Sequence, residues 1–232
     1  MARSLAIPLF VLSFASSATS PPTSLPTLAE YRAEPVQAAP PEELHATIRG
    51  TLENTAIRVT GPQGPLYEIW LRRAVPPKQP GSPEGQLGVV YGQLGEGTLV
   101  GAMRILLPAQ DYRRQQVKPG VYTLRYALHP VDGNHLGVAP QRDFLLLAPA
   151  NADNSPETSP AAALNDLSRK ASGTTHPSVW SLVAAEAERA TPALIHHADE
   201  DHWILTFRLA LGPPASTTLA MSLVVVGHAP EA

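Results

Sequence analysis

Three polar residues on one predicted loop have the types and the spacing of a metal site. His129, Asp132 and His135 follow one another at intervals of three residues. Two imidazoles and one carboxylate are a common ligand set for zinc and similar divalent ions, and a loop can bring all three to one centre. The sequence therefore offers a divalent-metal site, with zinc as the candidate cofactor. A water bound to such an ion would support metal-dependent hydrolysis.

The same loop also has a structural interpretation, which stays open. Asp132 and Gly133 form a common turn dipeptide, Pro130 is typical of turns, and the Asp132 side chain can bond its own loop backbone. Arg125 comes before the loop, on the strand face that also carries His129, and is a candidate for binding an anionic ligand. The sequence identifies no catalytic residue.

A second polar cluster lies closer to the carboxyl end of the chain. Residues 196–202 read His-His-Ala-Asp-Glu-Asp-His and separate two apolar stretches, which is where a hairpin loop is expected. Three histidines and three carboxylates could hold a cation, but such runs are more often solvated turns. We therefore expect a hairpin turn, with cation binding as the lesser alternative.

Other common signatures are missing from the sequence. The chain has no Gly-x-Ser-x-Gly elbow, no His-Glu-x-x-His pair and no cysteine. The glycine-rich run 85–101 lacks the Gly-Lys-Ser/Thr ending of a phosphate loop. Tyr67, Trp70 and Tyr91 could stack on a sugar ring, although packing in the core or at its rim is the favoured interpretation.

Composition limits the classes of partner. The chain has 232 residues, with 17 basic and 20 acidic side chains and a formal net charge of −3. Such a weak charge argues against a nucleic-acid or anionic-membrane partner. The chain is long enough to bury a hydrophobic core without disulfides.

The first residues have the layout of a secretory signal. Arg3 is followed by the apolar run 5–14, and the small residues 16–18 suit cleavage after Ala18. The apolar run is too short to cross a bilayer, so no transmembrane segment is expected. We expect an exported protein, either periplasmic or extracellular. Residues 19–43, rich in Pro, Ser, Thr and Ala, are expected to form a tether.

Residues 44–228 are expected to form one mainly β domain. The predicted strands are 44–49, 55–60, 66–72, 88–91, 99–107, 120–128, 144–147, 203–209 and 219–226. A helix is predicted after Ser159, closed by Gly173, and the ambiguous stretch 178–189 extends this into a helical insertion near 159–190. The pattern predicts a two-layer antiparallel β-sandwich with one or two short helices.

Alternation is clearest along residues 120–129. Tyr122, Leu124 and Tyr126 are predicted to point to one face of the sheet. Arg125 and His129 are predicted to point to the other face. This strand would place Arg125 and the start of the polar loop on the same side.

Four polar or turn-rich segments lie at residues 118–124, 129–137, 142–145 and 170–177. Together they resemble a group of exported β-proteins from environmental bacteria such as Acidobacteria, and the resemblance extends over about residues 44 to 227. The Pro-Gly-x-Tyr-x-Leu portion is also similar to a wider family of bacterial β-proteins. The resemblance implies export and β architecture. It transfers no catalytic residue, because no activity is established for the group.

The sequence therefore leaves two hypotheses from different classes. The first is a non-enzymatic, secreted or periplasmic β-sandwich module that binds a protein, glycan or small-molecule ligand, or associates with the cell envelope. The alternative is a divalent-metal-binding protein or metal-dependent hydrolase that uses His129, Asp132 and His135.

Overall fold

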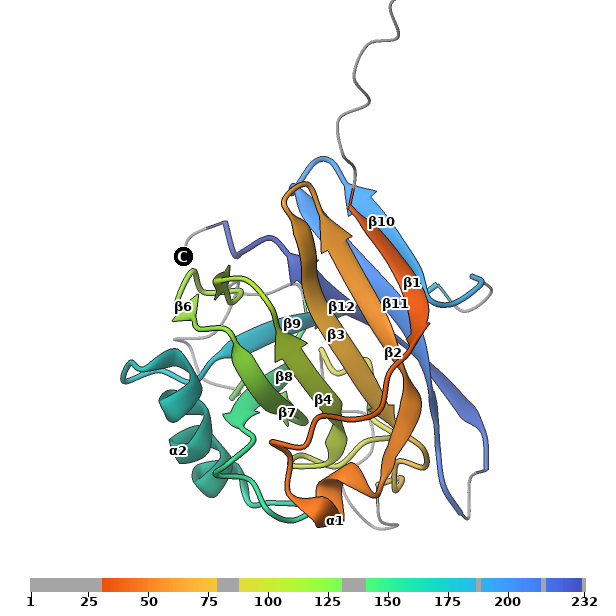
Figure 1. Ribbon diagram of the computed structural model, residues 1–232, viewed down its shortest axis with the longest axis vertical. Coiled ribbons are helices and arrows are strands. Elements are labelled where there is room, and N and C mark those ends of the chain that lie inside the picture. Colours follow the sequence, from red (N-terminus) through yellow and green to blue (C-terminus); the bar gives the residue numbers. More distant parts are fainter. Residues whose placement is uncertain (1–30, 79–87, 131–140, 187–188, 214–215, 231–232) are drawn as a thin grey trace, which may run out of the picture.

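The computed structural model describes residues 31–78, 88–130, 141–186, 189–213 and 216–230 (Figure 1). The predicted signal, residues 1–18, lies outside these ranges. The elements, in chain order, are β1 (Arg32–Gln37), α1 (Ala46–Arg49), β2 (Leu52–Gly61), β3 (Gly64–Arg72), β4 (Leu99–Ile105), β5 (Ala109–Gln110), β6 (Gln116–Val117), β7 (Gly120–Leu128), β8 (Asp143–Pro149), α2 (Ala161–Ser172), β9 (Val179–Val183), β10 (Ala193–His197), β11 (His202–Ala210) and β12 (Thr218–Val226).

One antiparallel sheet dominates the fold. Its ten strands run in the order β1-β2-β3-β4-β7-β8-β9-β12-β11-β10. The sheet curls so far that its two edge strands, β1 and β10, lie against each other (Figure 1). The mainly β class with two helices is therefore confirmed. The two-layer sandwich is not confirmed, because hydrogen-bonded pairing runs without a break from β1 round to β10, and the sheet forms a nearly closed barrel.

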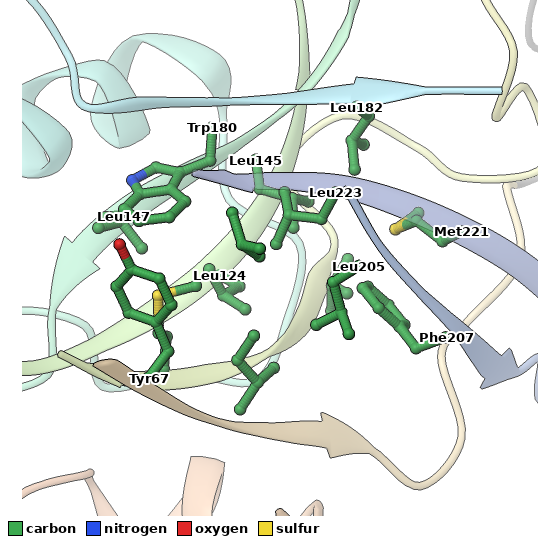
Figure 2. Packing of buried hydrophobic residues seen from close by; sticks show 14 of the residues in the cluster. Tyr67, Leu124, Leu145, Leu147, Trp180, Leu182, Leu205, Phe207, Met221 and Leu223 are labelled. Carbon is green, nitrogen blue, oxygen red and sulfur yellow. The ribbon is translucent and has the colours of Figure 1, made fainter. Parts of the chain in front are cut away.

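The inside of the barrel is filled by apolar and aromatic side chains from almost every strand (Figure 2). Tyr67 of β3 meets Trp180 of β9 edge to face across the interior, with ring centroids 5.4 Å apart. Leu124, Leu205 and Phe207 fill the space beside them, and each is 1% exposed or less. The interior is thus a packed core in which side chains from opposite walls meet.

Two helices cover parts of the outer face of the sheet. Leu164 of α2 packs over the outward side of β8 and its neighbours, in a second apolar cluster. Ile48 of α1 joins a third cluster around Trp70. Helix α2 confirms the predicted helix, and Gly173 ends it in the left-handed conformation with φ of 68°. None of the described helices is long and apolar enough to cross a membrane.

The predicted tether, residues 19–43, is wrong over its second half. Residues 32–37 form β1, which pairs along its whole length with β2. Ala33 packs against the cluster inside the barrel and Val36 against the cluster around Trp70, so β1 contributes to both faces of the sheet despite Pro35. Proline is tolerated there because β1 is an edge strand.

Three other assignments are also corrected. The predicted strand 44–49 is wrong, because residues 46–49 form α1, whose Ile48 side chain is buried. The stretch 178–189 contains β9 rather than helix, because Trp180 and Leu182 alternate into the core. Residues 88–91 form a loop, and its Tyr91 is buried in the barrel, where it donates to the carbonyl of Val183 at 2.5 Å.

Candidate functional site

His129 lies where β7 passes into the loop predicted to bind a metal. Its N–H donates to the Arg142 carbonyl at 2.8 Å, and its own carbonyl accepts from Arg142 Nε at 2.8 Å. The imidazole packs over Phe144, with ring centroids 4.4 Å apart. Asp132 and His135 lie outside the described residues. The metal site therefore stays a prediction.

The second polar cluster forms the expected hairpin turn between β10 and β11. His196 Nε2 lies 2.9 Å from Asp201 Oδ1, and His197 Nδ1 lies 3.8 Å from Glu200 Oε2. Across the part of the chain that the structure describes, no three His, Cys, Asp or Glu side chains group closely enough to hold a metal ion. The histidines of the turn are instead paired with its acids.

The two polar clusters lie at opposite ends of the sheet. β7, β8, β9, β12 and β11 are consecutive neighbours, and each pair is antiparallel. The end of β7, which leads to His129, is therefore at the same end of the sheet as the end of β11. His202, at the start of β11, lies at the other end. The fold does not bring the two clusters together.

Arg125 is fully buried, and its guanidinium is held by internal partners. It donates from Nε to Asp153 Oδ2 at 2.7 Å and from Nη2 to Asp153 Oδ1 at 2.9 Å, a bidentate ion pair. It also donates to the carbonyls of Gly97, Ser155 and Glu157. The predicted alternation is confirmed, because Arg125 lies on the face opposite Tyr126. This geometry favours an internal role, and the ligand-binding role stays a prediction.

Asp143 organises the same end of the barrel as His129, and the sequence did not identify it as important. Its carboxylate accepts from the backbone N–H groups of Val90 and Tyr91, both at 2.9 Å, and from the Tyr126 hydroxyl at 2.6 Å. All three donors are neutral and the residue is fully buried. Asp143 thereby fixes the loop that carries Tyr91 into the core. A carboxylate directly before an apolar strand is the signal that could have found it.

Because several tyrosines are buried, we expect the fold to lose stability at alkaline pH. Burial raises the pKa of Tyr91 to about 12. Burial, together with the hydrogen bond to Asp143, raises the pKa of Tyr126 well above its ordinary value. In the folded state the pKa of each tyrosine is higher than its value of about 10 in the unfolded chain. The protonated tyrosines therefore stabilise the fold fully below about pH 10, and this stabilisation is lost as the pH rises through the folded-state pKa values.

We therefore expect the free energy of unfolding to fall from about pH 10 upward, by about 1.4 kcal/mol per pH unit for each tyrosine that stays protonated in the native state. Denaturant unfolding measured at about pH 9, 10 and 11 checks this. A double variant, Tyr91→Phe with Tyr126→Phe, removes two of the groups and must show a shallower decline. An equal decline in both proteins would contradict the assignment.

Aromatic rings join the two edges of the sheet at one end of the barrel. Tyr31, just before β1, contacts Trp203 of β11 with ring centroids 4.8 Å apart. His196 of β10 stacks on Trp203 at 4.6 Å and 11°. A Cβ at Gly61 would lie 2.7 Å from the Tyr31 ring, so the glycine lets the tyrosine lie across the β2–β3 turn. We call this group, Tyr31, His196 and Trp203, the aromatic clasp.

Between β1 and β10, away from the clasp, the barrel wall has a hollow of about 250 Å³. We call it the seam hollow. Pro35 of β1, Ile57 of β2 and Leu71 of β3 line one side, and Pro192 and Phe207 line the other. Ile57, Leu71 and Phe207 also belong to, or pack against, the cluster that fills the barrel. Phe207 is 1% and Ile57 8% exposed, so of these three residues the half-buried Leu71 offers most of the apolar surface that can be reached from outside.

Two other surface hollows differ in character. One lies over residues 39–43 and Arg104, whose guanidinium is already paired with Glu43 at 3.2 Å. The other lies between Glu43, Asn151 and Lys170, with the start of β7 as its floor. Neither is lined by the large apolar side chains that fill the barrel, apart from Tyr122 in the second. The seam hollow is thus the better candidate for an apolar ligand.

The seam hollow was not predicted from the sequence. Its walls come from β1, β2, β3, β11 and the segment before β10, and only closure of the sheet brings them together. Tyr67, Trp70 and Tyr91, considered as sugar-stacking residues, are all 5% exposed or less and pack in the core. Comparison with known protein families, curated proteins and solved structures found no significant match.

Proposed function

We propose that this protein is an exported, non-enzymatic binding module whose ligand is a small molecule with an apolar part. The observation that carries the proposal is the seam hollow, where the half-buried Leu71 lies over the buried Ile57 and Phe207 and lines a space open to the outside. Apolar pockets with a few polar groups at their rim are the usual form of small-molecule sites.

The rigid surroundings of the hollow support the proposal. One wall belongs to β2 and β3, which pair with each other and with β1 and β4. The other belongs to β11, which pairs with β10 and β12. We infer that these two halves act as facing layers, as in a sandwich, with the aromatic clasp holding one end of the seam. A ligand would then meet a largely preformed site.

Export is supported by the residues themselves. The run 5–14 has the length of a signal-peptide core, and small residues at 16–18 suit cleavage after Ala18. A periplasmic or extracellular binding module would need no disulfide here, because the barrel buries a continuous apolar core.

Photolabelling of the folded chain tests the binding site. A short alkyl diazirine should react within two segments that are far apart in sequence, residues 53–57 and 191–208, because both line the seam hollow. An excess of 1-hexanol should compete with the label. The same chain unfolded in urea is the control, and in it the label should no longer be concentrated in these two segments.

A further inference from the structure

The rim of the seam hollow carries an acidic side chain, Glu53. Glu53, Thr55 and Ile57 alternate along β2, and all three line the hollow. The order along the strand places the carboxylate at one end of the row and the buried apolar residue at the other. Glu53 is exposed, whereas Ile57 is 8% exposed. The hollow therefore has an acidic side chain, Glu53, at its exposed edge and an apolar side chain, Ile57, on its buried wall.

Glu53 differs from the other acids of the neighbouring strands. Glu68 of β3 accepts from Arg58 at 2.6 Å, and Glu43, before α1, accepts from Arg104 at 3.2 Å. Glu34 of β1 lies 4.0 Å from Arg32. Among the described residues, Glu53 has no ion pair. Its carboxylate is therefore open to a cation brought by a ligand.

A basic residue also lines the hollow. Arg208 of β11 is exposed, but it is already engaged in an interaction of its own. Glu53 has no ion pair among the described residues, so we take its carboxylate as the group that meets a charged ligand.

We propose that the seam hollow binds an organic cation, a short alkyl chain that ends in a protonated amine. This inference rests on the proposed function and adds the charge of the ligand to it. The alkyl chain would lie against Ile57, Leu71 and Phe207, and the ammonium group would lie at Glu53. A volume of about 250 Å³ is below the range of about 300–1,000 Å³ typical of drug-sized ligands, so the ligand is small.

Three probes with the same six-carbon chain test the charge preference. Hexylammonium, 1-hexanol and hexanoate are titrated into the uniformly ¹⁵N-labelled chain, and backbone amide shifts are followed at low ionic strength. We expect hexylammonium to bind about threefold more tightly than 1-hexanol, as suits one exposed ion pair, and hexanoate to bind least tightly. Added salt should reduce the difference, because it screens exposed charges.

The variant Glu53→Gln assigns the preference to one side chain. We expect it to bind hexylammonium and 1-hexanol equally, while its affinity for 1-hexanol stays that of the original chain. Glu42→Gln is the matched control, because Glu42 is also exposed but lies away from the seam hollow. This control should keep the threefold preference.

The possible outcomes separate the two proposals. Equal affinities for all three probes at the seam hollow, or tightest binding of hexanoate, would overturn the cation preference and leave the binding module standing. A preference that survives Glu53→Gln would also overturn it. Amide shifts absent from the seam hollow with every probe would overturn both proposals.

Discussion

Replacing Arg125 with methionine is expected to lower the free energy of unfolding by about 3–5 kcal/mol, because the change leaves the Asp153 carboxylate buried without its cation. Arg125 and Asp153 are 0% and 3% exposed at their side chains. The free energy of unfolding of a native domain is only about 5–15 kcal/mol, so the variant would be close to the limit of folding. Urea denaturation followed by tryptophan fluorescence measures the change.

The effect should reach beyond the ion pair itself. The guanidinium also holds the carbonyls of Ser155 and Glu157, and the Asp153 carboxylate accepts from the Thr123 hydroxyl at 2.5 Å. Loss of Arg125 should therefore loosen residues 153–157, and amide exchange there should speed up more than in β11.

Two further variants define what this result means. Arg104→Met removes a partly exposed pair with Glu43, so it should cost about 0–1 kcal/mol. Adding Asp153→Leu to Arg125→Met should recover part of the loss, because the uncompensated charge is gone. If Arg125→Met cost no more than Arg104→Met, the buried clamp would not stabilise the fold as described.

Replacing Gly97 with alanine is expected to cost about 3 kcal/mol or more, for two separate reasons. The residue has φ of 85°, a conformation that L side chains rarely adopt. A Cβ there would also lie 1.9 Å from the carbonyl oxygen of Ser159. The backbone cannot easily move away, because the Gly97 N–H donates to the Tyr126 carbonyl at 2.8 Å and its own carbonyl accepts from Arg125.

Gly95→Ala is the matched control in the same loop. Its added Cβ would meet only the Thr98 hydroxyl oxygen, at the ordinary distance of 3.7 Å. We expect a change of less than about 1 kcal/mol there. Thermal unfolding of the two variants side by side checks the contrast, and equal melting temperatures would show that the contact between Gly97 and Ser159 is not tight.

Local patterns in the sequence predicted the elements with strong periodicity. Alternation along 120–129 identified β7 and correctly placed Tyr126 and Arg125 on opposite faces. A glycine after a helical run identified the end of α2 at Gly173. The polar run 196–202 was correctly predicted to be a hairpin turn. In each case the determining contacts are close in sequence.

Elements that depend on distant partners were not predicted. β1 contains Pro35 and is stabilised by pairing with β2, while β9 is short and is stabilised by Trp180 and Leu182 inside the barrel. Where the sheet closes, β1 lies against β10 and Tyr31 contacts Trp203, and these partners are far apart in the chain. For the same reason, no local motif marks the seam hollow.

Mapping the alkyl diazirine label on the folded chain is the decisive test of the seam hollow as a binding site. We expect residues 53–57 and 191–208 to carry most of the label, 1-hexanol to displace it from both segments together, and unfolding in urea to abolish this pattern. Label concentrated on residues 39–43 or around Lys170, with no effect of 1-hexanol at the seam hollow, would show that the hollow is not the binding site.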